Sequence, residues 1–207
     1  RDRRYLVKRQ TSKIKSLNMI KTAAVYLGSA IGRSQIFSDT AFRVGAELAK
    51  RGISVVYGGA CVGTMNSLAD GVLSQKGEII GVFPRGFKGK KSYQEQKIEV
   101  CHQGLTELIE VEDMSQRKKV MEKMSDCCIA LPGSYGTLDE LFEYIVNHQL
   151  GFHDKPVFIL NLEGFYDPII DMIKKMKETE FLRGYDQSFI HFCPTVEDII
   201  SKLLQAH

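Results

Sequence analysis

The sequence has no tryptophan, five prolines and no long apolar segment. None of its hydrophobic runs approaches the roughly 20 residues that a membrane-spanning helix requires, and no secretory signal with an apolar centre is visible. We therefore expect no membrane partner. A length of 207 residues suits one hydrophobic core, so we also expect a single catalytic or binding domain.

Metal-binding patterns are also missing. The five histidines are scattered and the five cysteines include no Cys-x-x-Cys pair, so we predict no metal site. Cys127 and Cys128 fall in an apolar run, where a reduced cysteine serves as a small core residue. An odd number of cysteines used in this way indicates a reducing compartment, and we predict a cytoplasmic protein.

Positive charge is concentrated at one end of the chain. Residues 1–21 contain eight Lys or Arg and one acid, Asp2, whereas the remainder contains 20 bases and 24 acids. The body is therefore mildly acidic, and its charge gives no reason to expect a nucleic-acid partner. We interpret residues 1–21 as a basic, disordered extension with Met19 as a candidate start, although transit peptides share this composition.

Short apolar runs alternate with helical patterns over residues 22–207. Strands that are apolar throughout and separated by helices predict a single α/β domain, with a parallel sheet covered by helices on both faces. Ligands bind such sheets beyond the carboxyl ends of the strands. The predicted strands are Ala23–Leu27, Ile53–Tyr57, Ile79–Phe83, Cys127–Leu131 and Pro156–Leu160, with shorter ones near Ile98–Cys101, Glu107–Val111 and Phe189–Phe192.

Two local signals mark the connections. Ser38 is predicted to cap a helix that ends at Gly52. Residues 85–97 are charged and rich in glycine, with no periodicity, and we interpret them as a mobile loop.

Glycine-rich loops follow three of the predicted strands, at Gly28–Gly32, Gly58–Met65 and Pro132–Thr137. Glycine lets backbone N–H groups approach an oxyanion, and the N-terminus of the following helix favours negative charge. A tight turn alone explains one such loop, but two or three at one sheet edge favour a phosphate site. The P-loop pattern is absent and no G-x-G-x-x-G follows the first strand, so a ligand with one phosphate fits best.

Charged residues near these loops are candidates for chemistry. The planar fork of Arg117 suits phosphate or ribose oxygens, whereas we interpret Lys118 and Lys119 as a solvated face. Glu140 has two interpretations. With Thr137 it matches a capping box, in which Thr caps a helix and Glu reaches back to the cap. A carboxylate one turn beyond a phosphate loop is also well placed to meet a ribose, and both interpretations stay open.

A family resemblance rests on two segments, Met114–Lys118 and Pro132–Glu140. Together they closely resemble the LOG ("Lonely Guy") family, whose pattern is an arginine-lysine pair on a helix followed by P-G-G-x-G-T-x-x-E. The resemblance includes the glycine loop 58–65 upstream and extends through residues 150–157 and 164–166 downstream.

The resemblance implies a Rossmann-like homodimer that needs no cofactor or metal. It implies hydrolysis of the N-glycosidic bond of a nucleoside 5′-monophosphate, such as AMP or an N6-substituted AMP, to free base and ribose 5-phosphate. Arg117 and Glu140 would occupy the catalytic positions. The residues expected to bind substrate or phosphate are Gly28, Ser29, Gly58, Gly59, Gly63, Met65, Met114, Lys118, Gly133, Ser134, Tyr135, Gly136 and Thr137.

Two departures and two alternatives accompany this resemblance. Ser134 stands where the family motif has a second glycine, and Ala60 replaces a glycine of the first loop, which bears on phosphate geometry and substrate choice. Family members are often labelled lysine decarboxylases, but no lysine lies in a setting that suits a pyridoxal phosphate Schiff base. The other alternative is a non-enzymatic carrier of a nucleotide or molybdenum cofactor. The presence of both Arg117 and Glu140 favours the enzyme.

Overall fold

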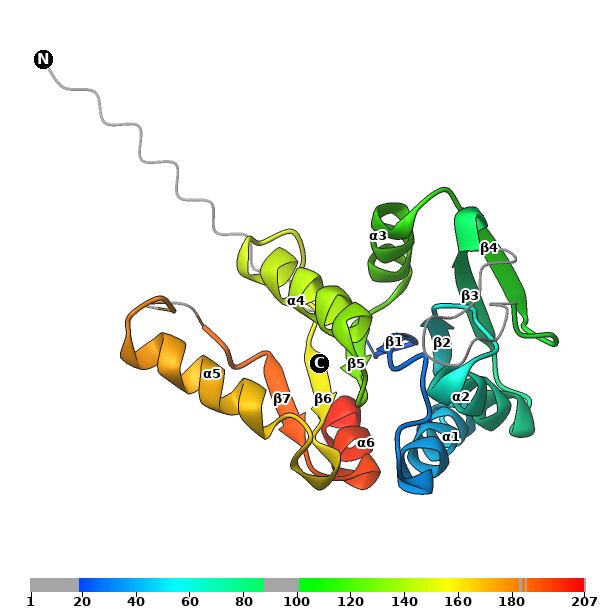
Figure 1. The fold of residues 1–207 in the computed structure, drawn as a ribbon, viewed down its shortest axis with the longest axis horizontal. Helices are drawn as coiled ribbons and strands as arrows, with labels where there is room; N and C mark the ends of the chain where they lie inside the picture. Colours follow the sequence, from blue (N-terminus) through cyan, green and yellow to red (C-terminus); the bar gives the residue numbers. More distant parts are fainter. Residues whose placement is uncertain (1–18, 88–100, 183, 185, 207) are drawn as a thin grey trace, which may run out of the picture.

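The computed structural model describes residues 19–87, 101–182, 184 and 186–206. Within them, seven parallel strands form one sheet in the order β4-β3-β2-β1-β5-β6-β7 (Figure 1). The strands are β1 (Thr22–Tyr26), β2 (Ser54–Tyr57), β3 (Ile79–Pro84), β4 (Glu107–Val111), β5 (Cys127–Ala130), β6 (Val157–Leu160) and β7 (Ile190–Cys193). The helices are α1 (Gln35–Lys50), α2 (Gly63–Ser74), α3 (Met114–Met124), α4 (Tyr135–Gln149), α5 (Asp167–Glu178) and α6 (Val196–Gln205).

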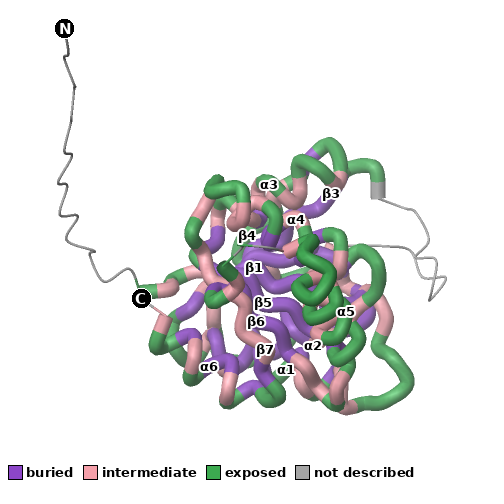
Figure 2. The backbone as a smooth tube through the Cα atoms, turned by 90° about the vertical axis from the view of Figure 1, so that its left-hand side faces the viewer, coloured by how far each residue is buried: buried purple, intermediate pink, exposed green. Residues whose placement is uncertain are grey.

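Helices cover both faces of the sheet. Helices α1, α2 and α6 lie on one face, and α3, α4 and α5 lie on the other (Figure 1). Ala23 and Val25 of β1 join the core on the first face, while Ala24 and Tyr26 join the core on the second. The central strands are buried along their length (Figure 2), which is why their sequences are apolar throughout rather than alternating. The predicted fold class is confirmed.

The direction in which strands are added reverses beside β1. The chain proceeds from β1 through β2 and β3 to β4, then returns to the other side of β1 as β5 and continues to β7. Tyr26 and Ala130, which end β1 and β5, are paired in register. The loops that follow these two strands therefore leave the sheet side by side, at the position where open α/β sheets bind their ligands.

Helix α1 begins one turn earlier than predicted. Ser34 caps it by accepting a hydrogen bond from the Ile36 N–H at 3.4 Å, whereas the predicted cap, Ser38, is buried inside the helix. Gly52 follows the helix with a φ of 68°, in agreement with its predicted role as the stop.

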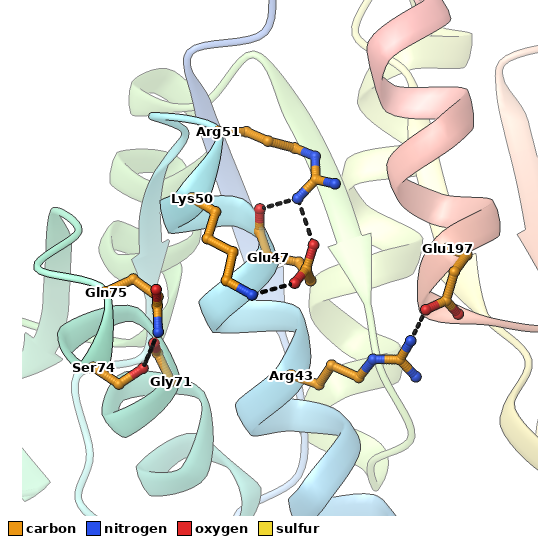
Figure 3. Close-up of polar contacts among 8 residues, drawn as sticks. All are labelled: Arg43, Glu47, Lys50, Arg51, Gly71, Ser74, Gln75 and Glu197. Atoms are coloured by element: carbon orange, nitrogen blue, oxygen red, sulfur yellow. Dashed lines mark hydrogen bonds and ion pairs between the residues drawn. The ribbon is translucent and has the colours of Figure 1, made fainter.

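Charged side chains form ion pairs along α1 and at its C-terminal end (Figure 3). Glu47 contacts Lys50 at 2.8 Å and, just beyond the helix end, Arg51 at 2.6 Å, and Arg43 pairs with Glu197 of α6. Exposed pairs of this kind typically contribute about 0.2–1 kcal/mol each. The two apolar cores, rather than these contacts, therefore hold the helices on the sheet.

Three predictions fall on residues outside the described ranges. They are the basic extension over residues 1–18, most of the loop 85–97, and the short strand near Ile98–Cys101 apart from its last residue. Cys101 itself forms an isolated antiparallel bridge with Ala60. The other two predicted short strands are present: Glu107–Val111 is β4, and the strand predicted at Phe189–Phe192 is β7, one residue further along at Ile190–Cys193.

Candidate functional site

The three glycine-rich loops pack against one another at the carboxyl edge of the sheet. A Cβ added to Gly28 would lie 3.4 Å from the Cα of Gly133, so the loops after β1 and β5 touch through their glycines. A Cβ on Gly63 would lie 2.3 Å from the carbonyl carbon of Ser29, and the Thr64 hydroxyl donates to the Gly28 carbonyl at 2.9 Å. The close packing of these backbones is the reason that these positions carry glycine.

A tyrosine from the downstream motif supports this edge. The Tyr166 hydroxyl donates to the carbonyl of Leu131 at 2.7 Å, and the backbone N–H of Tyr166 donates to the side chain of Asn161 at 2.7 Å. Tyr166 is buried, so this bond holds the start of the 132–136 loop against the body of the protein.

Helix α4 starts at this edge with its first N–H groups free of a side-chain cap. Its N-cap is Ser134, whose side chain makes no capping hydrogen bond, and α2 likewise starts after Val62 without one. By contrast, α1, α3 and α6 are capped by Ser34, Asp113 and Thr195. Uncapped N–H groups at a helix N-terminus favour an anion.

The capping-box interpretation of Glu140 is wrong. Helix α4 begins at Tyr135, so Thr137 and Glu140 both lie inside it and cannot cap it. The Glu140 carboxylate instead accepts a hydrogen bond from Nη2 of Arg117. Arg117 belongs to α3, which lies on the same face of the sheet as α4.

The Arg117–Glu140 pair is largely buried, with side chains 13% and 4% exposed. Burial raises the pKa of Glu140 above its usual range, and the charge and hydrogen bond of Arg117 oppose that rise. The Nε atom of Arg117 is buried without a protein partner among the described residues. A Cβ on Gly58 would lie 3.0 Å from Nη2 of Arg117, so Gly58 leaves room for the guanidinium.

Two adjoining cavities open at these loops. One of about 140 Å³ contains the ion pair, and the other, of about 160 Å³, lies beside the loop after β1. Ser134 lines both. The first is lined by Leu27, Ser29, Ala60, Met65, Phe83, Met114, Arg117, Ser134, Gly136, Thr137 and Glu140, and the second by Gly28, Ala30, Ile31, Gly32, Phe37, Thr64, Pro132, Gly133, Ser134 and Phe165.

The structure therefore brings ten of the fifteen candidate residues to the cavity walls. These ten are Gly28, Ser29, Met65, Met114, Arg117, Gly133, Ser134, Gly136, Thr137 and Glu140. Gly58 and Gly63 lie behind the walls as spacers, as described above. Gly59 has a φ of 76° and packs on Gly81, and Tyr135 is 90% exposed and lines neither cavity.

Lys118, a candidate for binding substrate, lines neither cavity and contacts side chains of α4 instead. Its side chain is 12% exposed and contacts Asp139 and Glu143 of α4, so its interpretation as part of a solvated face is wrong. Lys119 is exposed, as that interpretation requires. The structure also adds cavity residues that were not named as candidates. Phe83 ends the third apolar run, so its position at a strand end was a usable signal, and Phe165 lies in the segment 164–166 that shares the family resemblance.

Among the described residues, no group of three or more His, Cys, Asp or Glu side chains is gathered where it could hold a metal ion. None of the described helices is both long and apolar enough to cross a membrane.

Comparison with known proteins identifies the family. A family model described as "Possible lysine decarboxylase" matches residues 65–203. A probable cytokinin riboside 5′-monophosphate phosphoribohydrolase of Oryza sativa subsp. japonica is 39% identical over 183 residues, which cover 88% of this chain and 72% of the relative. A cytokinin riboside 5′-monophosphate phosphoribohydrolase of Arabidopsis thaliana is 36% identical over 183 residues, covering 88% and 77%.

A solved structure is similar at the level of the fold. The molybdenum cofactor binding protein from Rippkaea orientalis superposes with a TM-score of 0.64 at 19% identity, over 91% of this chain and 97% of that one. The family model and the two plant relatives, by contrast, match in sequence over most of the chain, including the segments that form the ion pair and the loop at the start of α4. The chain is therefore a member of the LOG family.

Proposed function

We propose that this protein hydrolyses the N-glycosidic bond of a nucleoside 5′-monophosphate, releasing the free base and ribose 5-phosphate. The observation that carries the proposal is the buried Arg117–Glu140 pair, which shares a cavity with the uncapped first turn of α4. A carboxylate and an anion site in one cavity match a substrate that has a phosphate at one end and develops positive charge on its ribose.

The phosphate would bind at the start of α4. Ser134, Gly136 and Thr137 line the cavity there, and the helix dipole favours a dianion at this position. A Cβ on Gly136 would meet nothing within 4 Å, so the backbone is open to a ligand. Gly28 and Ser29, which line the two cavities beside this turn, would contact the same end of the substrate.

Bond cleavage would depend on the ion pair. Glu140 is the one carboxylate among the described residues that line either cavity, and it would stabilise the oxocarbenium-like ribose and take a proton from the attacking water. The water oxygen bonds to C1′ as the bond from C1′ to the base nitrogen breaks, and that nitrogen gains a proton. The planar guanidinium of Arg117 would hold the substrate and stabilise the leaving base.

The base would lie against the apolar wall of the same cavity. Met65, Phe83 and Met114 supply that wall, and such side chains accept a planar ring without demanding a particular set of hydrogen bonds. We therefore propose AMP or an N6-substituted AMP as substrate. The names of the plant relatives, which are cytokinin riboside 5′-monophosphate phosphoribohydrolases, support this class.

The decarboxylase in the family model's description does not fit this site. That chemistry requires pyridoxal phosphate on a lysine, and none of the described residues lining the two cavities is a lysine. The likeness to a molybdenum cofactor binding protein, at 19% identity, concerns the fold alone.

A direct test compares AMP with adenosine. Purified protein is incubated with each, and adenine is measured by chromatography. Because the phosphate contacts at α4 are lost with adenosine, kcat/KM for AMP should exceed that for adenosine by on the order of a hundredfold or more, equivalent to about 3 kcal/mol of binding. Equal kcat/KM values for AMP and adenosine would show that the start of α4 does not bind the phosphate.

The site would belong to a homodimer in the cytoplasm. Phe142, Val146 and Leu150, spaced four residues apart on α4, are 36%, 44% and 64% exposed, and Leu138 continues this line toward the cavity. An apolar stripe on a surface helix suits a second copy of the chain, which the family resemblance also implies. Cys127, Cys128 and Cys193 are buried as small core residues, which supports a reducing compartment.

A further inference from the structure

A second ion-pair group lies beside Arg117 and Glu140 and joins the same two helices. The Lys118 amine contacts both carboxylate oxygens of Asp139 at 2.9 Å and one oxygen of Glu143 at 2.5 Å. Each of these contacts crosses from α3 to α4. The two groups are adjacent in sequence, so whatever fixes Lys118 against α4 also fixes Arg117 against Glu140.

Helix α3 packs on the sheet through Met121, which is buried, and through the partly buried Val120 and Met124. These contacts hold α3 on the sheet, whereas its contacts with α4 include polar side chains. One turn beyond Lys118, Glu122 accepts a hydrogen bond from the Asn147 amide of α4 at 2.6 Å. Polar contacts thus join α3 to α4 at Arg117, Lys118 and Glu122, and we infer that they help to set the two helices in register.

The amine of Lys118 has no hydrogen left for a substrate. A lysine ammonium has three donors, and the three contacts to Asp139 and Glu143 account for all of them. Burial lowers the pKa of Lys118, but the hydrogen bonds that its amine donates to Glu143 and Asp139 outweigh that effect and leave the pKa above its usual value. The lysine is thus held as a cation by α4.

We propose that Lys118 is a positioning residue that clamps α3 to α4 and so holds Arg117 at Glu140, rather than a residue that contacts the substrate. The kinetic part of this inference rests on the proposed hydrolysis. The contact between the helices does not depend on that reaction.

The kinetic test is Lys118→Met, which keeps the apolar stem and removes the charge. If Lys118 positions the pair, kcat for AMP should fall on the order of a hundredfold, because small displacements of reacting groups are that costly. KM should rise by much less than kcat falls, because the phosphate contacts at the start of α4 are kept even where Arg117 is displaced. Lys119→Met is the matched control, since Lys119 is the exposed neighbour, and it should behave as wild type. A rise in KM of tenfold or more with kcat unchanged would make Lys118 a substrate contact and overturn the proposal.

A charge swap separates the clamp from a general need for lysine at position 118. Lys118→Glu combined with Glu143→Lys restores a cation and an anion across the seam, with the lysine now on α4. The double variant should recover kcat to at least tenfold above Lys118→Glu alone. No recovery, in a variant that circular dichroism shows to be folded, would contradict the clamp.

A stability measurement keeps the two proposals distinguishable. Thermal melts of Lys118→Met, Glu143→Gln and the double variant form a cycle that needs no activity. The clamp predicts that Tm of the double variant lies no lower than that of Lys118→Met, because the contact is already lost. Additive losses would overturn it. If wild type does not cleave AMP but the cycle is non-additive, the proposed function fails and the clamp stands.

Discussion

Glu140 is the residue on which the chemistry depends, and its surroundings give it an unusual carboxylate. It lies inside α4, is 4% exposed and accepts a hydrogen bond from Arg117. Burial favours the neutral form and raises the pKa of Glu140, while the charge and hydrogen bond of Arg117 favour the ionised form and oppose that rise. A carboxylate serving only to hold Arg117 would need no cavity beside it, yet both side chains line one.

At this scale the informative change is Glu140→Gln. An amide can still accept from Arg117, but it neither takes a proton from water nor carries charge toward the ribose. We expect kcat for AMP to fall by at least about a hundredfold, the usual contribution of a general base. Tm should also fall, by an amount equivalent to about 1–3 kcal/mol, because Arg117 loses its counter-charge.

Steady-state kinetics and thermal melts of the same preparations check both parts. Glu197→Gln, on the exposed face of α6, is the control for replacing an ion-paired glutamate away from the site. Turnover of Glu140→Gln near the wild-type value would show that the carboxylate is structural.

At the scale of elements, the loop from β5 to α4 combines two kinds of glycine. A Cβ at Gly133 would lie 2.1 Å from the Thr137 hydroxyl, so this glycine is required by packing. A Cβ at Gly136 would meet nothing, yet Gly136 lines the cavity that contains the ion pair. One loop thus holds a glycine that serves the fold and another that would serve the ligand.

The same substitution at these two positions should have opposite effects. Gly133→Ala overpacks the loop and should lower stability by about 1–3 kcal/mol. Gly136→Ala places a good helix former in the first turn of α4, so stability should be kept or rise by about 0.4–1 kcal/mol. Its methyl group enters the phosphate cradle, and KM for AMP should rise on the order of tenfold, equivalent to about 1.4 kcal/mol.

Thermal melts and AMP kinetics of the two variants check this pair of expectations, each variant serving as the control for the other. An unchanged KM in Gly136→Ala would place the phosphate elsewhere.

At the scale of the whole molecule, α4 links the site to the expected dimer. Its first turn and Glu140 line the cavity, while Phe142 and Val146 face solvent on the same helix. A partner seated on this stripe would cover apolar surface and restrain the helix that carries the carboxylate.

Val146→Glu places a charge in the middle of that stripe. We expect sedimentation to change from dimer to monomer at micromolar concentration, because burying an unpaired charge opposes association. Leu204→Glu on α6, where the leucine is 56% exposed on the other face of the sheet, should leave the dimer intact. A monomeric wild-type protein, or a Val146→Glu dimer as tight as wild type, would exclude this stripe as the interface.

The sequence by itself determined the fold class and the edge of the sheet where the loops meet. Strands such as Cys127–Ala130 are buried on both sides, and that burial is written locally as continuous apolar residues, so periodicity revealed it. The glycines at 28, 63 and 133 were equally legible, because only glycine permits such close approach of backbones. The arginine and glutamate of the family motifs identified the two candidates for chemistry.

The tertiary structure decided which neighbours those residues have. Thr137 and Glu140 fit a capping box, and only the position of α4, which begins at Tyr135, excluded it. The pairing of Glu140 with Arg117 and of Lys118 with Asp139 joins residues more than 20 positions apart. Local patterns report whether a side chain is buried, since burial sets the residue type at each position. They do not report its partner, because that depends on how two helices lie across a sheet.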